Sequence, residues 1–267
     1  MNEVIYLTDA YTMNNRNYQT KAIVLKQRPM GEANRLLTLY TETSGKISAI
    51  ARGSRKPGSK LGGNLELLNL VEVSLGRGRN LDHINECSVI DRYRYVREDL
   101  AKIAHGLYLA ELCEVFGEER SSNPGLFRLL KDTLVRLNGE NFSDLVLREF
   151  EMRLLLHCGF YPELNECVEC RDKLQPKMCA FVPSFGGAIC SGCESEIGEF
   201  KVKLSVPGMK LLRHVQRSNG SQSEVGVIRV PQEVSNEIQN VLKTYLEFIM
   251  EKKIKSATFL DLVSNGN

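Results

Sequence analysis

The first third of the chain alternates short apolar runs with turn-forming residues, a pattern typical of β-strands. We expect five strands between residues 20 and 90, within TKAIVLKQR, NRLLTLYTE, KISAIARG, LNLVEVSLGR and DHINECSVI. The tripeptides Thr43-Ser44-Gly45 and Gly78-Arg79-Asn80 predict short connections, and a polar, glycine-rich stretch, GSRKPGSKLGGN, separates the third strand from the fourth. Five strands with one long loop predict a small closed barrel, and both an OB-fold and an SH3-like barrel fit this strand count.

Beyond the barrel, apolar residues recur with the spacing of helices. Asn123 followed by Pro124 predicts the start of one helix, and Gly117 and Gly159 predict the ends of two others. Two further helical stretches, VPGMKLLRHVQ and SNEIQNVLKTYLEFIMEKK, follow after an interruption that is rich in cysteine. The second half of the chain is therefore predicted to be a helical bundle with an insertion.

A chain of 267 residues exceeds the usual size of one domain. We expect an α+β multidomain protein, in which an N-terminal OB-fold β-barrel precedes an α-helical domain with a four-cysteine, zinc-ribbon-like insertion. The expected division is a loose N-terminal tail (1–18), an OB-fold domain (19–95), a helical domain (96–250) with its metal element at about 165–198, and a C-terminal tail (251–267). Met1 and Met13 are both candidate start residues.

Four cysteines form the most specific chemical pattern in the sequence. Cys167, Cys170, Cys190 and Cys193 are arranged as two C-x2-C pairs with nineteen residues between them, a spacing typical of zinc sites. Four thiolates complete the tetrahedral coordination of Zn²⁺, so no position remains for water or substrate. The pattern predicts one structural zinc ion, and two disulfides or two unrelated reduced pairs are the less favoured alternatives.

Positive charge is concentrated in the predicted barrel. Residues 20–97 contain 14 Lys and Arg against 7 Asp and Glu, whereas the rest of the chain is mildly acidic. This asymmetry favours a module that binds a polyanion, with an ordinary solvated surface as the alternative. The candidate phosphate contacts are Lys46, Arg52, Arg55, Lys56, Lys60, Arg77 and Arg79. Tyr40, Tyr93 and Tyr95 are the candidate aromatic residues for base stacking, with a place in the core as an equal alternative for Tyr40.

The sequence contains no motif that predicts catalysis. It has no G-x4-G-K-[ST] motif, no H-E-x-x-H, and only four widely spaced histidines. We therefore expect neither an enzyme nor a nucleotide cofactor. No apolar run is long enough to cross a bilayer and no signal peptide is recognisable, so we expect no membrane association. The scattered remaining cysteines fit a reducing cytoplasm.

Several of these motifs together resemble the RecO family of bacterial DNA repair proteins. The similarity covers about residues 18–250, from TKAIVLKQRPMGEANRLLTLYTETSGKISAIARGSRKPGSKLGG through LREFEMRLLLHCGFYPEL to the four cysteines and F-G-G. Two departures are Asn34, where the family more usually has Asp, and a longer tail before Tyr18. The resemblance implies an OB-fold, a helical domain and a zinc-ribbon-like element.

The resemblance also implies a function. Family members bind single- and double-stranded DNA, anneal complementary strands, and act with RecR to load RecA onto DNA coated by the single-strand-binding protein SSB. They bind the acidic C-terminal tail of SSB, for which Arg128, Lys131 and Arg136 are candidate contacts here. A cytoplasmic, nucleoid-associated location is expected. The alternatives are a zinc-ribbon RNA-binding factor, a scaffold that recruits partners, and an uncharacterised hydrolase.

Overall fold

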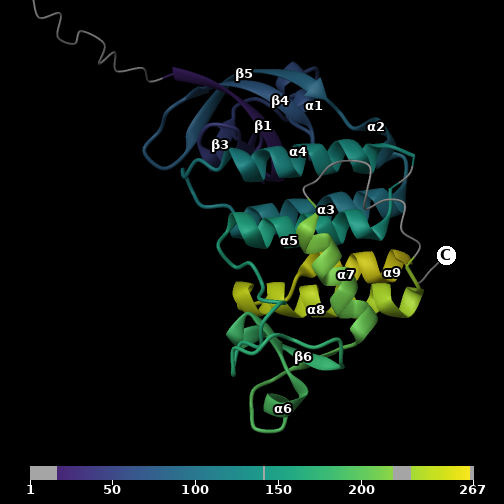
Figure 1. The fold of residues 1–267 in the computed structure, drawn as a ribbon. Coiled ribbons are helices and arrows are strands. Elements are labelled where there is room, and N and C mark those ends of the chain that lie inside the picture. Colours follow the sequence, from purple (N-terminus) through teal and green to yellow (C-terminus); the bar gives the residue numbers. More distant parts are fainter. Residues whose placement is uncertain (1–16, 141, 219–229, 265–267) are drawn as a thin grey trace, which may run out of the picture.

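A barrel, a stack of helices and a small cysteine-rich element follow one another along the long axis of the molecule (Figure 1). The structure is a computed structural model, and it describes residues 17–140, 142–218 and 230–264. The predicted tail at residues 1–18 therefore lies, except for its last two residues, outside the described part. Those two residues belong to the barrel, because Asn17 pairs with Gly76 and Tyr18 with Leu75.

The N-terminal unit is a closed barrel of five strands in the order β1-β2-β3-β5-β4. Its strands are β1 (Asn17–Met30), β2 (Asn34–Thr41), β3 (Gly45–Ala51), β4 (Leu70–Gly76) and β5 (Asp82–Asp91). β4 returns to pair with β1, and β3 pairs with β5 in parallel. A short helix, α1 (Lys60–Asn64), stands in the long connection after β3. This five-stranded barrel confirms the OB-like prediction.

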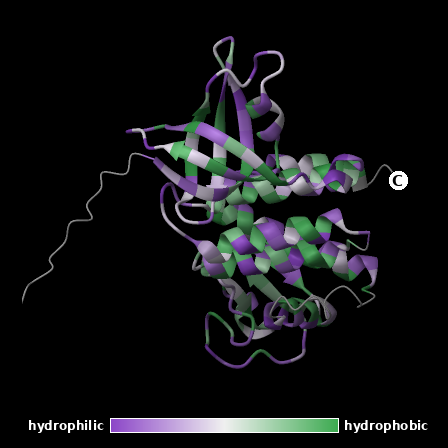
Figure 2. Cartoon of the chain, turned by 90° about the horizontal axis from the view of Figure 1, so that it is seen from above, coloured by the Kyte–Doolittle hydropathy of each residue, from purple (hydrophilic) through white to green (hydrophobic). Residues whose placement is uncertain are grey.

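Alternation of inward and outward side chains explains why these segments form a barrel. Ile47, Ala49 and Ala51 of β3 are fully buried, and the residues between them are partly exposed. Val71, Val73 and Leu75 repeat the pattern in β4 and join the same apolar cluster. Figure 2 shows the corresponding alternation of hydrophobic and hydrophilic residues along the barrel strands.

The helical domain is packed around the helix Asp144–His157, most of whose residues are buried. Its helices are α2 (Arg94–Arg97), α3 (Leu100–Phe116), α4 (Pro124–Asn138), α5 (Asp144–His157), α7 (Val206–Arg217) and α8 (Gln232–Met250). Asp99 and Asn123 accept hydrogen bonds from the first turns of α3 and α4 and so fix where these helices begin. The three helix boundaries predicted from Gly117, Asn123 and Gly159 agree with the structure.

The expected C-terminal tail at 251–267 was wrong for most of its length, because a further helix, α9 (Lys255–Ser264), forms there. Ile254, Ala257 and Leu260 are buried in the helical core. The Glu111 carboxylate of α3 accepts hydrogen bonds from the backbone N–H of Lys255 (3.1 Å) and of Ser256 (2.7 Å). Tertiary contacts with α3 therefore stabilise a helix that is too short for its sequence pattern alone to predict.

The cysteine-rich element is a small sheet at the far end of the helical domain from the barrel (Figure 1). It contains β6 (Cys179–Val182), a 3-10 turn η1 (Pro183–Phe185), β7 (Gly187–Ile189), α6 (Ser191–Glu194) and β8 (Val202–Leu204). The strands are ordered β7-β6-β8. Phe181 of β6 packs edge-on against Tyr245 of α8, with 5.1 Å between ring centroids. The element is thus packed against the bundle.

Hydrogen bonds and ion pairs fasten the barrel to the helices. Lys26 of β1 donates to the Glu114 carboxylate of α3 at 2.7 Å. Arg120, in the connection between α3 and α4, donates to the buried Asp82 carboxylate at the start of β5 at 2.9 Å. Arg97 donates to the backbone carbonyl of Leu67 at 2.6 Å. Within the described residues, no helix has both the length and the apolar character needed to cross a membrane.

Candidate nucleic-acid interface and metal centre

The basic loop, which we define as residues 52–60, runs from the end of β3 to the first residue of α1 and presents four exposed cations: Arg52, Arg55, Lys56 and Lys60. The turn between β1 and β2 holds this loop in place. Gly53 N–H donates to Asn34 Oδ1 at 2.9 Å, and Arg55 N–H donates to the Ala33 carbonyl at 2.9 Å. Asn34 supplies the acceptor oxygen that an Asp would supply, so the departure from the family pattern leaves this contact intact.

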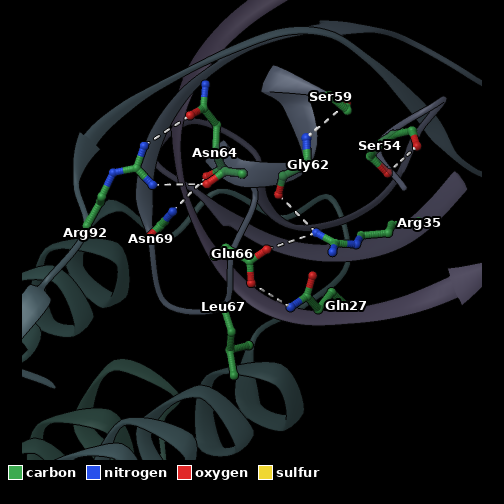
Figure 3. Close-up of polar contacts among 12 residues, drawn as sticks. Gln27, Arg35, Ser54, Ser59, Gly62, Asn64, Glu66, Leu67, Asn69 and Arg92 are labelled. Atoms are coloured by element: carbon green, nitrogen blue, oxygen red, sulfur yellow. Dashed lines mark hydrogen bonds and ion pairs between the residues drawn. The ribbon is translucent and has the colours of Figure 1, made fainter. Parts of the chain in front are cut away.

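Helix α1 closes the basic loop through a set of polar contacts drawn in Figure 3. Gly62 must be glycine, because a Cβ there would lie 2.1 Å from the Ser54 carbonyl oxygen. The Gly62 carbonyl accepts from Arg35 Nη1 at 3.0 Å, and the same nitrogen lies 3.1 Å from the Glu66 carboxylate. Gln27 of β1 donates to the other Glu66 oxygen at 3.3 Å. The loop backbone is therefore held by two strands.

Arg92, just after β5, is a cation beside this loop that sequence reasoning missed. Its guanidinium is exposed and donates to the Gly63 carbonyl at 3.0 Å and to Asn64 Oδ1 at 3.3 Å (Figure 3). Arg55 makes a comparable local contact, because its Nη1 donates to the Gly31 carbonyl at 2.8 Å. Only the fold brings Arg92 to the loop, since about thirty residues separate them in sequence.

The structure places Lys46 apart from the basic loop, at the seam between barrel and helices. Its Nζ donates to the backbone carbonyl of Glu114 at 2.7 Å, and its own backbone pairs with Glu118 and Arg120. Lys46 therefore anchors the helical domain, and we remove it from the phosphate-contacting set. Its position at the start of a strand gave no signal of this contact.

Arg77 and Arg79 are exposed in the turn between β4 and β5, at the other end of β1. The 14 residues of β1 separate this turn from the basic loop, roughly 45 Å of strand path at about 3.3 Å per residue. Arg77 lies over the ring of Tyr18, 5.4 Å from its centroid. The predicted cations thus occupy two ends of the barrel instead of one continuous patch.

Two of the three tyrosines expected to stack on bases are buried. Tyr40 and Tyr93 are each 1% exposed and belong to the core between barrel and helices, which confirms the core alternative for Tyr40 and contradicts base stacking for Tyr93. Tyr95 in α2 is 62% exposed and remains a candidate. Burial could not be inferred from sequence because all three tyrosines lie next to charged or apolar neighbours of similar kind.

A groove between α4 and α5 contains residues that were expected to bind the SSB tail, and we call it the tail groove. Its volume is about 390 Å³. Arg128 and Arg136 line it, but Lys131 is absent from its lining and instead lies 3.5 Å from Asp132. Arg136 is held by the buried carboxylate of Glu149 at 2.7 Å. Two of the three predicted tail contacts are thus brought together in one groove.

Two further basic groups of the tail groove were missed from sequence, Arg153 and His157 of α5. Burial and the nearby charges of Arg153 and Arg128 lower the pKa of His157, so the ring is neutral near pH 7. The apolar residues Leu129, Val146 and Phe150 complete the lining. The groove therefore combines a positive rim with an apolar floor.

The four predicted metal ligands converge in the cysteine-rich element. Their sulfur atoms all lie within 4.8 Å of one another, with 3.9 Å between Cys170 and Cys190 and 3.6 Å between Cys190 and Cys193. A tetrahedron of four sulfurs, each about 2.3 Å from a zinc ion, has edges of about 3.8 Å. The sulfur positions therefore fit a tetrahedral metal ion.

The thiol of one candidate ligand, Cys167, has a lower pKa than the thiols of Cys158 and Cys179, which lie outside the cluster. Burial raises the pKa of Cys167, but hydrogen bonds from the backbone N–H groups of Cys190, Cys170 and Glu169 outweigh it and lower the value to about 7. Burial raises the pKa of the non-ligand Cys158 and Cys179 to about 11. The element thus favours a thiolate at Cys167, the form that binds metals.

An OB-type barrel with a basic loop, joined to helices that carry four clustered cysteines, defines the class of protein: a two-domain fold with a candidate metal centre. Two family models match the chain: Recombination protein O N terminal over residues 13–93, and Recombination protein O C terminal over residues 97–258. Together they cover most of the described residues. The chain belongs to the RecO family of DNA repair proteins.

Curated relatives support this assignment. The DNA repair protein RecO of a Dehalococcoides mccartyi strain is 37% identical over 246 residues, which cover 92% of this chain and 95% of the relative. The RecO protein of a Roseiflexus species is 36% identical over 93% of this chain and 87% of its own length. That of Pelotomaculum thermopropionicum is 33% identical over 91% and 93%.

Proposed function

We propose that this chain binds single- and double-stranded DNA through its barrel, anneals complementary strands, and acts with RecR to load RecA onto SSB-coated DNA. The observation that carries the proposal is the basic loop, whose cations are exposed on a backbone fixed by β1, β2 and α1. Cations displace the counterions condensed on a phosphate chain, and they do so without reading sequence.

The individual cations of the basic loop differ in their freedom to bind phosphate. Within the described residues, Arg52, Lys56 and Lys60 make no side-chain hydrogen bond or ion pair, whereas Arg55 is bonded to the Gly31 carbonyl. We assign the principal phosphate contacts to the first three. Arg55 shapes the loop and contributes charge. Tyr95 is the exposed aromatic residue beside Arg94 and Arg97 on which a base could stack.

Arg77 and Arg79 provide a second group of phosphate contacts at the opposite end of β1. Two basic sites on one barrel suit annealing, because each strand's charge is reduced while the strands remain in proximity. A double-stranded product would span both sites. This division replaces the single surface expected from sequence.

The proposed partner of the tail groove is the acidic C-terminal tail of SSB. Arg128 and Arg153 at the groove's rim would pair with its carboxylates, and the apolar floor around Phe150 would accept its terminal aromatic side chain. RecR and RecA enter the proposal through family membership alone. A cytoplasmic, nucleoid-associated location follows from the same proposed role, which requires no catalytic residue and no nucleotide.

The four cysteines would hold one structural zinc ion that stabilises the end of the helical domain. Residues 165–198 contain three cations and five carboxylates, and a tetrathiolate zinc centre adds two further negative charges. This negative charge opposes contact with DNA phosphates. The proposed zinc element therefore braces the helices and leaves DNA binding to the barrel.

Annealing of complementary oligonucleotides coated with SSB tests the proposal. We expect annealing by the intact chain, and a marked loss when the SSB lacks its acidic tail. Uncoated strands serve as the control, because their annealing does not depend on the tail. Absence of annealing in both cases, or a clear preference for RNA over single-stranded DNA, would contradict the proposed function.

A further inference from the structure

A basic cleft of about 900 Å³, distinct from the basic loop and the tail groove, opens between β1 and the turn that joins α8 to α9. Lys26 and Arg28 line it from the barrel. Lys252, Lys253 and Lys255 line it from the helical domain. Two units of the fold thus contribute cations to one concave surface, of a size typical of ligand sites.

The charge inside the basic cleft is positive once local pairing is considered. Six cations line it, but only three carboxylates: Glu111, Glu114 and Glu119. The Glu114 carboxylate accepts both of its short contacts, 2.7 and 2.9 Å, from Lys26 Nζ. Glu111 is engaged by the first turn of α9, and these hydrogen bonds, together with the nearby charge of Lys252, outweigh burial and hold its pKa below the ordinary value. Of the carboxylates in this described lining, only Glu119 faces the cleft without such a partner.

Three of the cations have charge available for a ligand. Arg28, Lys252 and Lys255 are exposed, and none of them makes a side-chain ion pair or hydrogen bond within the described residues. Lys253 differs, because its Nζ lies 2.8 Å from the Glu247 carboxylate. Arg28 stands on one wall, and Lys252 and Lys255 stand on the other.

An aromatic ring completes the chemistry of the basic cleft. Phe259 of α9 lines the same wall as the lysines and is only partly buried against the helical core. Cations that follow a backbone and an aromatic ring that accepts a base together characterise surfaces that bind single strands. Bases stacked within a duplex could not reach a ring in a concave wall.

The basic cleft also adjoins the basic loop along the barrel. Arg28 lies near the end of β1, three residues before Gly31. The carbonyl of Gly31, just beyond the strand, accepts a hydrogen bond from Arg55 of the loop. A strand bound at the loop can therefore continue past the turn between β1 and β2 and into the cleft. This path passes one exposed carboxylate, Glu32, in the turn.

We propose that the basic cleft binds one single strand of nucleic acid, with phosphates at Arg28, Lys252 and Lys255 and a base against Phe259. This inference rests on the proposed DNA binding and extends it to a second element of the chain. The barrel alone would then hold less of a strand than the whole protein. α9, at the C-terminal end of the described chain, becomes part of the binding surface.

A single introduced tryptophan provides the first test, because the chain contains none. Phe259→Trp places the fluorophore in the cleft, and stacking on a base of oligo(dT) is expected to quench its emission. The matched control is Phe200→Trp, on an exposed residue of the cysteine-rich element, where we expect little change. An unchanged Phe259→Trp signal under conditions in which the strand binds would overturn the proposal.

A second test avoids any change to packing. Lys252→Gln with Lys255→Gln should lower the slope of log K against log salt for single strands by about 1.4, which corresponds to two phosphate contacts. Lys203→Gln with Lys210→Gln removes the same charge from exposed positions elsewhere and should leave the slope unchanged. Equal slopes in all three proteins would contradict the cleft while leaving loop binding intact. If the unmodified chain binds no strand, the proposed function itself fails.

Discussion

Asp82 is a fully buried carboxylate at the seam between barrel and helices. It accepts hydrogen bonds from Tyr18 Oη at 2.5 Å, from Gly78 N–H at 2.9 Å and from Arg120 Nη2 at 2.9 Å. Burial alone would raise the pKa of Asp82, but Arg120, Tyr18 and Gly78 outweigh it and lower the value. One carboxylate thus joins two strands and the connection between α3 and α4.

We expect Asp82→Asn to lower the free energy of unfolding at pH 7 by about 2 kcal/mol, the magnitude of a hydrogen bond to a charged group. Because the folded pKa is depressed, the stabilisation is complete above the ordinary Asp pKa near 4 and is lost as pH falls through the folded value. Urea denaturation of both proteins from pH 7 to pH 3 measures this. A stability difference that stays constant across that range would contradict the assignment.

Arg148 and Glu151 form a second buried pair, one turn apart on α5, with Nη2 3.0 Å from the carboxylate. Tyr108 donates to the same carboxylate at 2.6 Å. Glu151→Gln alone should cost about 3–5 kcal/mol, because it leaves a buried guanidinium without its counter-charge. Arg148→Met with Glu151→Leu should cost much less. Denaturation of both variants tests this, and a loss in the double variant as large as that in Glu151→Gln would contradict the coupling.

Single residues are where sequence reasoning was least complete. The cationic loop was recognisable because cations and glycines cluster within a few positions. Lys46 could not be separated from the loop cations by sequence, because its charge resembles theirs while its hydrogen-bond acceptor lies in a helix about seventy residues away. Tyr93 was misassigned, and the choice between core and surface stayed open for Tyr40, because which face of an element is covered depends on the second domain.

At the scale of elements, the four-cysteine centre determines how the end of the helical domain is held. Structural zinc centres contribute an apparent binding free energy of about 10 kcal/mol or more to local folding. Cys190→Ser should therefore abolish zinc binding, increase proteolysis within residues 165–198 and lower the thermal midpoint, while DNA affinity changes less than about threefold. Metal analysis, limited proteolysis and anisotropy give these readouts.

Cys158→Ser is the matched control for this prediction, because Cys158 is half-buried and lies outside the cysteine cluster. It should retain one zinc ion per chain. Zinc retained by Cys190→Ser would contradict the four-ligand centre. A parallel loss of DNA affinity from a folded Cys190→Ser protein would instead mean that the element contacts DNA.

The tail groove makes a prediction that separates its rim from the neighbouring surface. Arg128→Glu or Arg153→Glu should weaken binding of an SSB tail peptide at least about tenfold, because each reverses a charge that faces the peptide carboxylates. Lys131→Glu alters the same helix outside the groove lining and should have little effect. Peptide titration by calorimetry compares them, and equal losses for all three would contradict the groove.

Elements with long, regular apolar patterns were predicted well, and short elements were not. The boundaries of α3 and α4 follow from their caps and from Gly117, all of which are local signals. β1 extends two residues beyond the expected boundary because it pairs with β4. α9 forms because Glu111 of α3 accepts hydrogen bonds from its first turn and the helical core covers its apolar side. Both of these depend on partners distant in sequence.

At the scale of the molecule, salt dependence measures how many phosphates the chain contacts. Replacing Arg52, Lys56 and Lys60 together by Ala should reduce the single-strand slope of log K against log salt by about 2. Replacing Arg171, Lys173 and Lys177, which are exposed on the cysteine-rich element, removes equal charge and should change neither slope nor affinity. Anisotropy titrations across salt decide between the two surfaces, and equal effects would contradict the loop assignment.

The overall order of barrel, helices and cysteine-rich element was predictable, because each has its own period or spacing. The arrangement of their side chains in space could not be predicted from sequence. Sequence placed all of the barrel's cations on one surface, whereas the closed strand order puts Arg77 and Arg79 at one end and the basic loop at the other. Closure of a barrel depends on pairing between its first and fourth strands, and no local pattern records which turns become neighbours.

The hydrogen bonds and ion pairs between the barrel and the helices limit how this protein can be recombined with its relatives, in the laboratory or in evolution. A chimera that receives residues 17–93 from a relative must also receive acceptors for Arg120 and Arg97 and a cation opposite Glu114. Without them, the graft would leave a carboxylate or guanidinium without a partner at the interface between the two domains. Module exchange in this architecture therefore has to follow matched borders, and the barrel is inherited together with its neighbour.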